Sequence, residues 1–186
     1  FPGAVTLALL RVLAQERGYA NAAHDQGGET KWGISKRAYP HLDIPNLTYE
    51  QAEQIYYTDY WVPHNLSHIQ DVEVAAKLMD IMVQFGAGGG KRIWESALHE
   101  VAANTALTGQ CGDVCLTNKL NDDVMIKALS KVMTKKYLQI VQSKPAQKKF
   151  LKGWLARAND VTYLGDGISK QAIKRPLQIQ PAIKLP

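Results

Sequence analysis

Two carboxylates and a hydroxyl lie close together near the start of the chain, in the stretch ERGYANAAHDQGGETKWGI from Glu16 to Ile34. Glu16, Asp25 and Thr30 span fifteen residues, so a short loop would let them face one another. Hydrolysis of a glycosidic bond needs such a set, because one carboxyl must protonate the leaving oxygen while another group handles water or charge across the sugar. We therefore take Glu16, Asp25 and Thr30 as candidate catalytic residues.

An apolar helical pattern precedes Glu16. The pattern consists of Val5, Leu9, Val12 and Leu13. These residues recur at i, i+4, i+7 and i+8, which is the spacing of one helix face. Glu16 continues this face, and a carboxyl on a buried face loses hydration, which raises its pKa and suits it to donate a proton. Gly18 is a plausible left-handed helix cap just beyond it. The alternative is a surface glutamate at a fraying helix end.

A turn and a strand pattern follow the helix. Asp25-Gln26-Gly27-Gly28 predicts a turn, since adjacent glycines supply positive φ without strain. Thr30, Trp32 and Ile34 then alternate with other residues at strand spacing. We expect one small β-hairpin that brings Asp25 and Thr30 toward Glu16. An aspartate before two glycines also closes turns by bonding to the backbone, so Asp25 has a purely structural alternative.

The motif E-R-G-Y-x5-D-x-G-G-x-T-x-x-G-I resembles the signature of glycoside hydrolase family 108, the N-acetylmuramidases of phage endolysins and bacterial wall hydrolases. The family usually has Gly where this chain has Arg17. The spacing of Glu16 and Asp25 is also similar to that in phage T4-type lysozymes, whose third member is a Thr. Three further stretches resemble the family between about residues 5 and 158: Tyr60-Trp61, Asp80-x4-Phe85-Gly86 and Gly153-Trp154-Leu155-x-Arg157.

The resemblance implies a mainly α, lysozyme-like, two-lobed helical domain with one small β-hairpin. It implies cleavage of the β-1,4 bond between N-acetylmuramic acid and N-acetylglucosamine in bacterial peptidoglycan. Glu16 would be the general acid, Asp25 would position water or stabilise charge, and Thr30 would help to hold the water. Tyr19 would support Glu16 or contact the sugar. No cofactor or metal is required, and we expect a monomer that acts at the cell wall or in the periplasm, encoded by a phage or a bacterium.

Length and composition are those of one globular domain: 186 residues, 46% hydrophobic and 21% charged. We predict a muramidase domain at 1–160, with a catalytic lobe at about 1–85 and a helical lobe at about 91–160, and then an extended tail at 161–186. No apolar run is long enough to span a membrane. The net charge of +5 favours anionic partners, although no basic stripe interleaved with aromatics points to nucleic acid. The chain begins at Phe1, and a signal sequence is not determinable from it.

Local signals predict the remaining elements. Ser35 is expected to cap a short helix ending at Tyr39, and Thr48-x-x-Gln51 is a capping box for a helix to about Tyr60. Further ranges follow from caps and apolar spacing: a buried helix from Asp71 to Phe85, a glycine hinge at 86–90, a helix around 93–101, a loop at 104–117, a helix from Asn121 to about Gln142 and a last helix from Pro145.

Three features have two interpretations each. Tyr60 and Trp61 follow a helix end, where aromatic rings either complete the core or stack on a sugar. The last predicted helix has a cationic face formed by Lys148, Lys149, Lys152 and Arg157. This face is either simply solvated or attracts the anionic cell wall. Cys111 and Cys115 either form a small disulfide or stay as thiols.

Two rival functions remain. His64-x3-His68 has metal-ligand spacing, which would suit a zinc-dependent wall amidase, but Pro63 adjoins it and no Glu follows His64. A non-catalytic wall-binding module is the second rival, since positive charge alone could hold the chain on the wall. Loss of activity in chelator would indicate the amidase, and sedimentation with peptidoglycan without new reducing ends would indicate the binding module.

Overall fold

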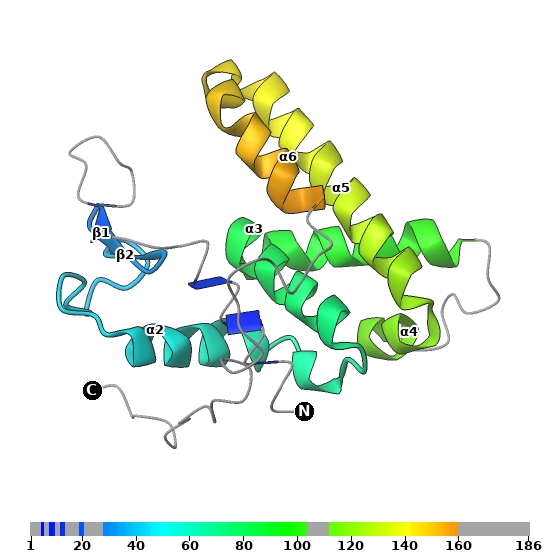
Figure 1. Ribbon diagram of the computed structural model, residues 1–186, viewed down its shortest axis with the longest axis horizontal. Coiled ribbons are helices and arrows are strands. Elements are labelled where there is room, and N and C mark those ends of the chain that lie inside the picture. The colour runs from blue at the N-terminus through cyan, green and yellow to red at the C-terminus, as the bar shows by residue number, and fades with distance from the viewer. Residues whose placement is uncertain are drawn as a thin grey trace.

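A computed structural model describes residues 28–103 and 112–159, together with 5, 8–9, 12–13 and the backbone of 19–20. The described chain is mainly helical and carries one small antiparallel sheet, which confirms the predicted fold class. In Figure 1 the sheet and α2 lie on one side of the first part of α3, and α4, α5 and α6 lie on the other. Glu16, Asp25, Cys111 and the tail at 161–186 lie outside the described residues, and the division into two lobes stays a prediction.

The predicted apolar face before Glu16 is buried. Its four members are helical and at most 6% exposed: Val5, Leu9, Val12 and Leu13. They join one continuous hydrophobic core with residues of α2, α3, α5 and α6. No helix among the described residues has the length and apolar character needed to cross a membrane.

The sheet has three short strands rather than the two of a hairpin. β1 (Tyr19–Ala20) pairs with β2 (Thr30–Lys31), which pairs with β3 (Ile34–Ser35), both antiparallel. Trp32 and Gly33 form the turn between β2 and β3 with φ of 55° and 75°, the positive values that a two-residue hairpin turn requires. The helix predicted from Ser35 to Tyr39 is wrong, because Ser35 ends β3 and only turns follow it. The predicted cap is nevertheless present, since the Ala38 amide donates to the Ser35 hydroxyl at 3.3 Å.

Helix α2 (Tyr49–Tyr56) begins as predicted. The Thr48 side chain accepts from the Gln51 amide, and the Gln51 side chain accepts from the Thr48 amide, so both halves of the capping box are present. The predicted end near residue 60 is a π-helical turn, η1 (Tyr57–Trp61). A 3-10 turn, η2 (Leu66–His68), then leads toward the central helix.

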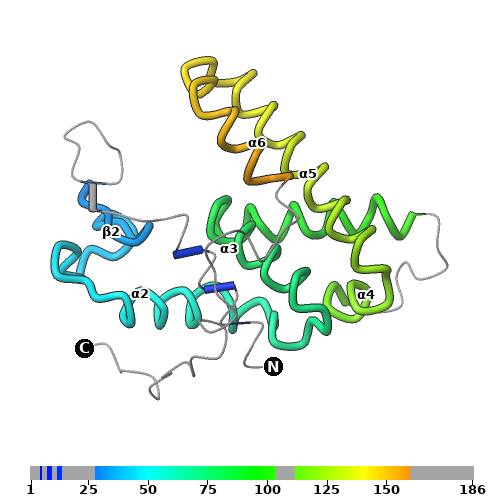
Figure 2. Tube along the Cα trace, in the orientation of Figure 1, coloured from blue at the N-terminus to red at the C-terminus, as the bar shows by residue number. Residues whose placement is uncertain are grey.

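Helix α3 (Val72–Ala102) runs through the middle of the molecule (Figure 2). Asp71 caps it by accepting from the amides of the second and third helical residues, as predicted. Gly86 interrupts the helix with φ 70° and ψ 162°, a conformation that is essentially restricted to glycine. Within the range predicted as a glycine hinge, 86–90, the helix breaks only at Gly86, because Gly88 to Gly90 are helical.

The second half of the chain forms α4 (Asp113–Lys119), α5 (Asp122–Ser143), a 3-10 turn η3 (Pro145–Phe150) and α6 (Leu151–Asn159). Asn121 caps α5 as predicted, through a hydrogen bond from the Val124 amide. The loop predicted at 104–117 is wrong from Asp113 onward, where α4 begins. Figure 1 shows α5 and α6 as a hairpin whose connecting turn lies away from α3.

Candidate functional site

A cleft of about 350 Å³ lies between the sheet and the helices α3, α5 and α6. Gly33, in the turn between β2 and β3, lines one side of it. The other side combines residues from α3, α5 and α6: Val83, Gln84, Phe85, Tyr137, Ile140, Trp154 and Arg157. The cleft therefore lies between the turn that follows Thr30 and the end of the first part of α3, where Gly86 interrupts the helix.

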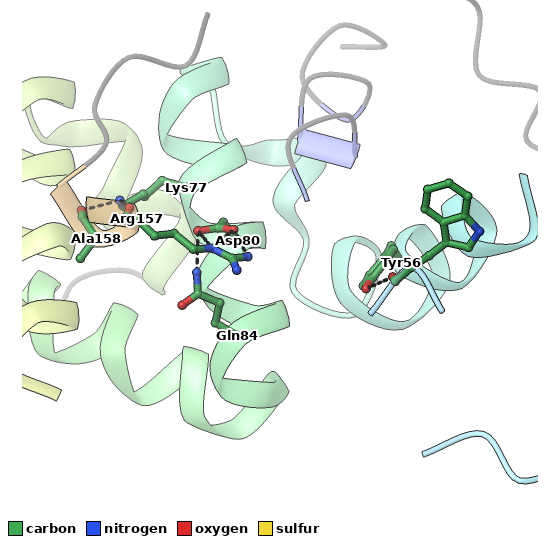
Figure 3. A network of polar contacts seen from close by, with 7 residues as sticks. Tyr56, Lys77, Asp80, Gln84, Arg157 and Ala158 are labelled. Atoms are coloured by element: carbon green, nitrogen blue, oxygen red, sulfur yellow. Dashed lines mark hydrogen bonds and ion pairs between the residues drawn. The ribbon is translucent and has the colours of Figure 1, made fainter. Parts of the chain in front are cut away.

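A buried ion pair holds Arg157 at this cleft. Asp80 is fully buried on α3, and the Arg157 guanidinium donates to it from Nη2 at 2.7 Å and from Nε at 3.2 Å. Gln84, one helical turn further along, donates to the other Asp80 oxygen at 3.1 Å (Figure 3). A charge taken out of water requires such partners, so Asp80 fixes the positions of both polar side chains that line the cleft.

Lys77 attaches the end of α6 to α3. Its side chain is fully buried, and its ammonium donates to the carbonyl of Ala158 at 2.7 Å and to that of Arg157 at 3.4 Å. The last carbonyls of a helix have no partner within the helix, so a cation is favourable there. Figure 3 shows Lys77 and Asp80 approaching α6 from neighbouring turns of α3. Together they fix the helix that forms one wall of the cleft.

Stacked aromatic rings continue that wall. Tyr137 on α5 lies 5.1 Å from Phe85 of α3 and 5.1 Å from Trp154 of α6, measured between ring centroids. Trp154 in turn lies 5.8 Å from Phe150. Aromatic rings present flat apolar faces of the kind that pack on the faces of sugars, so the wall combines aromatic surface with the Arg157 cation.

The turn between β2 and β3 forms the opposite wall, and contacts with α2 hold this turn in place. The Tyr56 hydroxyl of α2 donates to the Trp32 carbonyl at 2.7 Å, and the Trp32 ring meets the Tyr49 ring edge-on at 5.5 Å. These contacts fasten the sheet to α2, so that Gly33 stays at the cleft.

Thr30 is the one predicted catalytic side chain within the described residues. It is half-buried on β2, opposite Ala20 on one side and Ser35 on the other. Its hydroxyl donates to the Gly28 carbonyl at 3.3 Å, a contact within its own turn. Glu16 and Asp25 lie outside the described residues, and only the backbone of Tyr19 is described, paired with Lys31.

The two aromatic residues predicted to bind saccharide, Tyr60 and Trp61, differ in how deeply they are buried. Trp61 is 1% exposed and its indole N–H donates to the Ser67 hydroxyl at 2.8 Å, so it is a core residue, the alternative that the sequence left open. Tyr60 is half-buried. Burial raises the pKa of Tyr60, and the carboxylate of Asp59 adds to the increase. Neither Tyr60 nor Trp61 is among the residues that line the cleft.

Arg157 is not part of the cationic surface predicted for the last helix. Its side chain is 16% exposed and bound to Asp80, so this assignment is wrong, whereas Lys148, Lys149 and Lys152 are exposed. Sequence reasoning missed the ion pair because helical spacing alone placed Arg157 opposite the apolar stripe. The available signal was the presence of two charged residues, Lys77 and Asp80, in a helix that is apolar nearly all round.

A larger cavity of about 970 Å³ lies elsewhere, between η2, α4 and the second part of α3. Lys91 there forms ion pairs with Asp113 and Glu95, and the His64 ring bonds through Nδ1 with the Tyr60 carbonyl. Its lining includes His64, His68 and the exposed Cys115, but no group of three metal-ligating side chains occurs in the part of the chain that the structure describes.

Comparison with known proteins gives one family match and one similar structure. Residues 9–86 match the family described as Glycosyl hydrolase 108, which confirms the resemblance predicted from the motifs. The structure of Brucella abortus SagA is similar to this one, with a TM-score of 0.66, 21% sequence identity, and coverage of 91% of this chain and 98% of that chain. At that identity the likeness shows a shared fold. No curated protein matches the chain significantly.

Proposed function

We infer from the match over residues 9–86 that this chain is a glycosyl hydrolase of family 108, and we propose that it is a muramidase. Its substrate would be peptidoglycan, and the bond cleaved would be the β-1,4 bond between N-acetylmuramic acid and N-acetylglucosamine. One observation carries the proposal: the matched region contains both Gly33 and the stretch from Val83 to Phe85, and these line the same cleft. Gly33, near the end of the family signature, thus lies at this cleft.

The proposed chemistry uses acid catalysis and charge stabilisation. Glu16 would donate a proton to the glycosidic oxygen, and Asp25 would position the attacking water or stabilise the positive charge that develops on the sugar. The strand register supports this assignment, since Glu16 lies three residues before β1 and Asp25 lies between β1 and β2. Protonation and charge stabilisation suffice for this reaction, so no cofactor is proposed.

Thr30 and Tyr19 would assist. Thr30 opposes Ala20 in the sheet, so its hydroxyl lies beside the strand that follows Glu16. In the described state this hydroxyl donates to the Gly28 carbonyl, and a hydroxyl oxygen has lone pairs left to accept from a water. Tyr19 begins β1 and would support Glu16 or the sugar. Tyr60, half-buried, is retained as a proposed saccharide contact, and Trp61 is not.

The helical wall would bind the saccharide. Trp154 offers an aromatic surface, and Arg157, fixed by Asp80, places a cation at a cleft whose substrate carries lactyl and peptide carboxylates. We propose that the chain acts at the cell wall, as endolysins and bacterial wall hydrolases do. The zinc amidase and the non-catalytic binding module are the alternatives.

The decisive test is mass spectrometry of purified peptidoglycan digested with the parent chain and with Glu16→Gln. The parent should release fragments that end in reducing N-acetylmuramic acid. Glu16→Gln keeps the shape but has no proton to give, so the rate should fall by ~10²–10⁴-fold at an unchanged melting temperature. Reducing N-acetylglucosamine ends would assign a different glycosidic bond. Free peptide without new reducing ends, abolished by chelator, would indicate the amidase, and co-sedimentation without any cleavage would indicate the binding module.

A further inference from the structure

The hairpin of α5, η3 and α6 has an unusual charge distribution. Nine Lys and Arg residues lie between Val124 and Asn159, and no Asp or Glu lies among them. The rest of the chain, which includes Asp122 and Asp123 at the start of α5, carries 13 Lys and Arg against all 17 Asp and Glu, so it is net negative while residues 124–159 are strongly positive. Such an asymmetry within one chain indicates an anionic partner for the positive part.

Most of this charge is exposed and lacks an acidic partner. Lys131 forms an ion pair with Glu100 at 2.8 Å, and Arg157 is bound to Asp80. The other seven lysines are exposed and form no ion pair with any described residue. These lysines are Lys127, Lys135, Lys136, Lys144, Lys148, Lys149 and Lys152. Four of these seven lie at or beside η3, in the turn between α5 and α6 that Figure 1 shows away from α3.

An exposed aromatic ring lies among these lysines. Phe150 is 46% exposed at the end of η3, and the Lys149 ammonium lies 4.9 Å from the centre of its ring. Phe150 also stacks on Trp154, with 5.8 Å between the ring centroids, so the ring is anchored to α6. We call this surface the hairpin tip, formed by Lys144, Lys148, Lys149, Phe150 and Lys152.

We propose that the hairpin tip docks on an anionic lipid membrane. Lysines attract anionic headgroups, and their long stems let the ammonium groups remain in the headgroup layer while an apolar side chain goes deeper. Phe150 supplies that side chain. A soluble polyanion, such as a wall polymer or a nucleic acid, would bind the lysines and gain nothing from an apolar side chain entering a lipid phase. The pairing of charge with an exposed ring therefore favours a bilayer surface.

Docking by the tip would also orient the cleft. Tyr137 of α5 lines the cleft, and Lys144, directly after the end of that helix, follows it by seven residues, a rise of about 10 Å. A membrane-bound tip would hold the cleft close above the lipid. The attachment is at the surface of the bilayer and is independent of the proposed catalytic chemistry, so it can be tested by binding alone.

The test is co-sedimentation of the full chain with vesicles of phosphatidylcholine and with vesicles of an equimolar mixture of phosphatidylcholine and phosphatidylglycerol. The parent should bind only the mixed vesicles. The triple variant K148Q/K149Q/K152Q should bind them about 100-fold more weakly at low salt, because each lysine at an anionic surface contributes about fivefold in affinity. The matched control R92Q/K119Q/K127Q removes the same charge from exposed positions outside the tip and should lose far less.

The ring is tested separately. Phe150→Ser should bind the mixed vesicles about tenfold more weakly, and this loss should persist at high salt, which screens the contribution of the lysines. Phe150→Leu stays apolar and should bind like the parent, and melting temperatures identify any variant that loses its fold. Equal losses in the triple variant and its control would overturn the tip as the docking surface. If Phe150→Ser binds the vesicles as the parent does while the lysine variant loses affinity for a DNA duplex, the partner is a polyanion, and the membrane proposal fails.

Discussion

Asp80 and Arg157 are 77 residues apart in the chain, and their side chains are joined by a 2.7 Å hydrogen bond between Nη2 and a carboxylate oxygen that is fully buried. The pair connects α3, whose first part belongs to the region matched to the hydrolase family, to α6, which lies beyond it. The cleft has residues of both helices in its wall, so its shape depends on this contact.

Removing one partner of the pair should strongly destabilise the protein. Arg157→Met leaves the Asp80 charge buried without its main partner, and we expect the free energy of unfolding to fall by about 3–5 kcal/mol. The double variant Asp80→Leu/Arg157→Met removes both charges and should recover much of that loss. Urea unfolding of the parent and the variants measures both effects. A loss below about 1 kcal/mol for Arg157→Met, the usual size for an exposed pair, would contradict the buried role.

Asp25→Asn separates catalysis from turn closure. The amide keeps most of the hydrogen bonds that an aspartate side chain makes to a turn and removes only the charge. If Asp25 stabilises charge or positions water, release of reducing ends should fall by orders of magnitude at an unchanged melting temperature. A variant that keeps full activity would assign Asp25 to the turn alone.

The role of Thr30 is tested with a matched pair of substitutions. Thr30→Val removes the hydroxyl that donates to the Gly28 carbonyl, and Thr30→Ser keeps it. If the hydroxyl holds the attacking water, Thr30→Val should lose activity at least tenfold, an effect of about 1.4 kcal/mol on the barrier, while Thr30→Ser stays near the parent. Equal activity of the two variants in the reducing-end assay would leave Thr30 with its turn contact only.

Two helical glycines should respond oppositely to the same substitution. A Cβ at Gly90 would lie 2.8 Å from the Met82 Cα, because the helix breaks at Gly86 and its two parts pack closely. Gly90→Ala should therefore lower the free energy of unfolding by about 1–3 kcal/mol. Gly153→Ala, on α6, meets no atom within 4 Å and should raise stability by up to about 1 kcal/mol. Urea unfolding would show both signs, and a stable Gly90→Ala would contradict the close packing.

Alkaline pH should destabilise the protein partly through Tyr39. Burial raises the pKa of Tyr39 above its ordinary value of 10.0, and its 2.6 Å hydrogen bond to Asp59 adds to this. Above pH 10 the unfolded chain releases this proton while the folded chain holds it, so the free energy of unfolding falls as pH rises. Tyr39→Phe should show a shallower decline when unfolding is measured at about pH 8 and about pH 11. Parallel curves would refute the contribution of Tyr39.

Local sequence signals predicted the helices well where a side chain bonds to the backbone a few residues away. The caps at Thr48, Asp71 and Asn121 are of this kind, and each begins a helix where predicted. Ser35 makes its capping bond to the Ala38 amide but also pairs with Thr30 in the sheet, and a single turn follows it instead of a helix. Close packing explains the glycine run, since Gly90 is used for its small size next to Met82 rather than for flexibility.

The cleft could be predicted only in part. The family motif pointed to the hairpin whose turn lines the cleft, because the motif lies within one continuous stretch of sequence. The helical wall depends on contacts between residues nearly eighty positions apart, such as Asp80 with Arg157, and no local spacing encodes them. Trp61 shows the same limit, because helix position alone does not distinguish a core indole from an exposed one.

The contacts from α3 to α6 also have a consequence for the order of synthesis. A ribosome makes Lys77 and Asp80 about eighty residues before the helix that supplies the Ala158 carbonyl and the Arg157 guanidinium. Until that helix emerges, two charges in the central helix lack these partners, so burying them would be costly. A nascent or truncated chain that stops short of residue 157 cannot complete this core. Native packing of the central helix therefore requires synthesis at least through residue 158, where α6 supplies these partners.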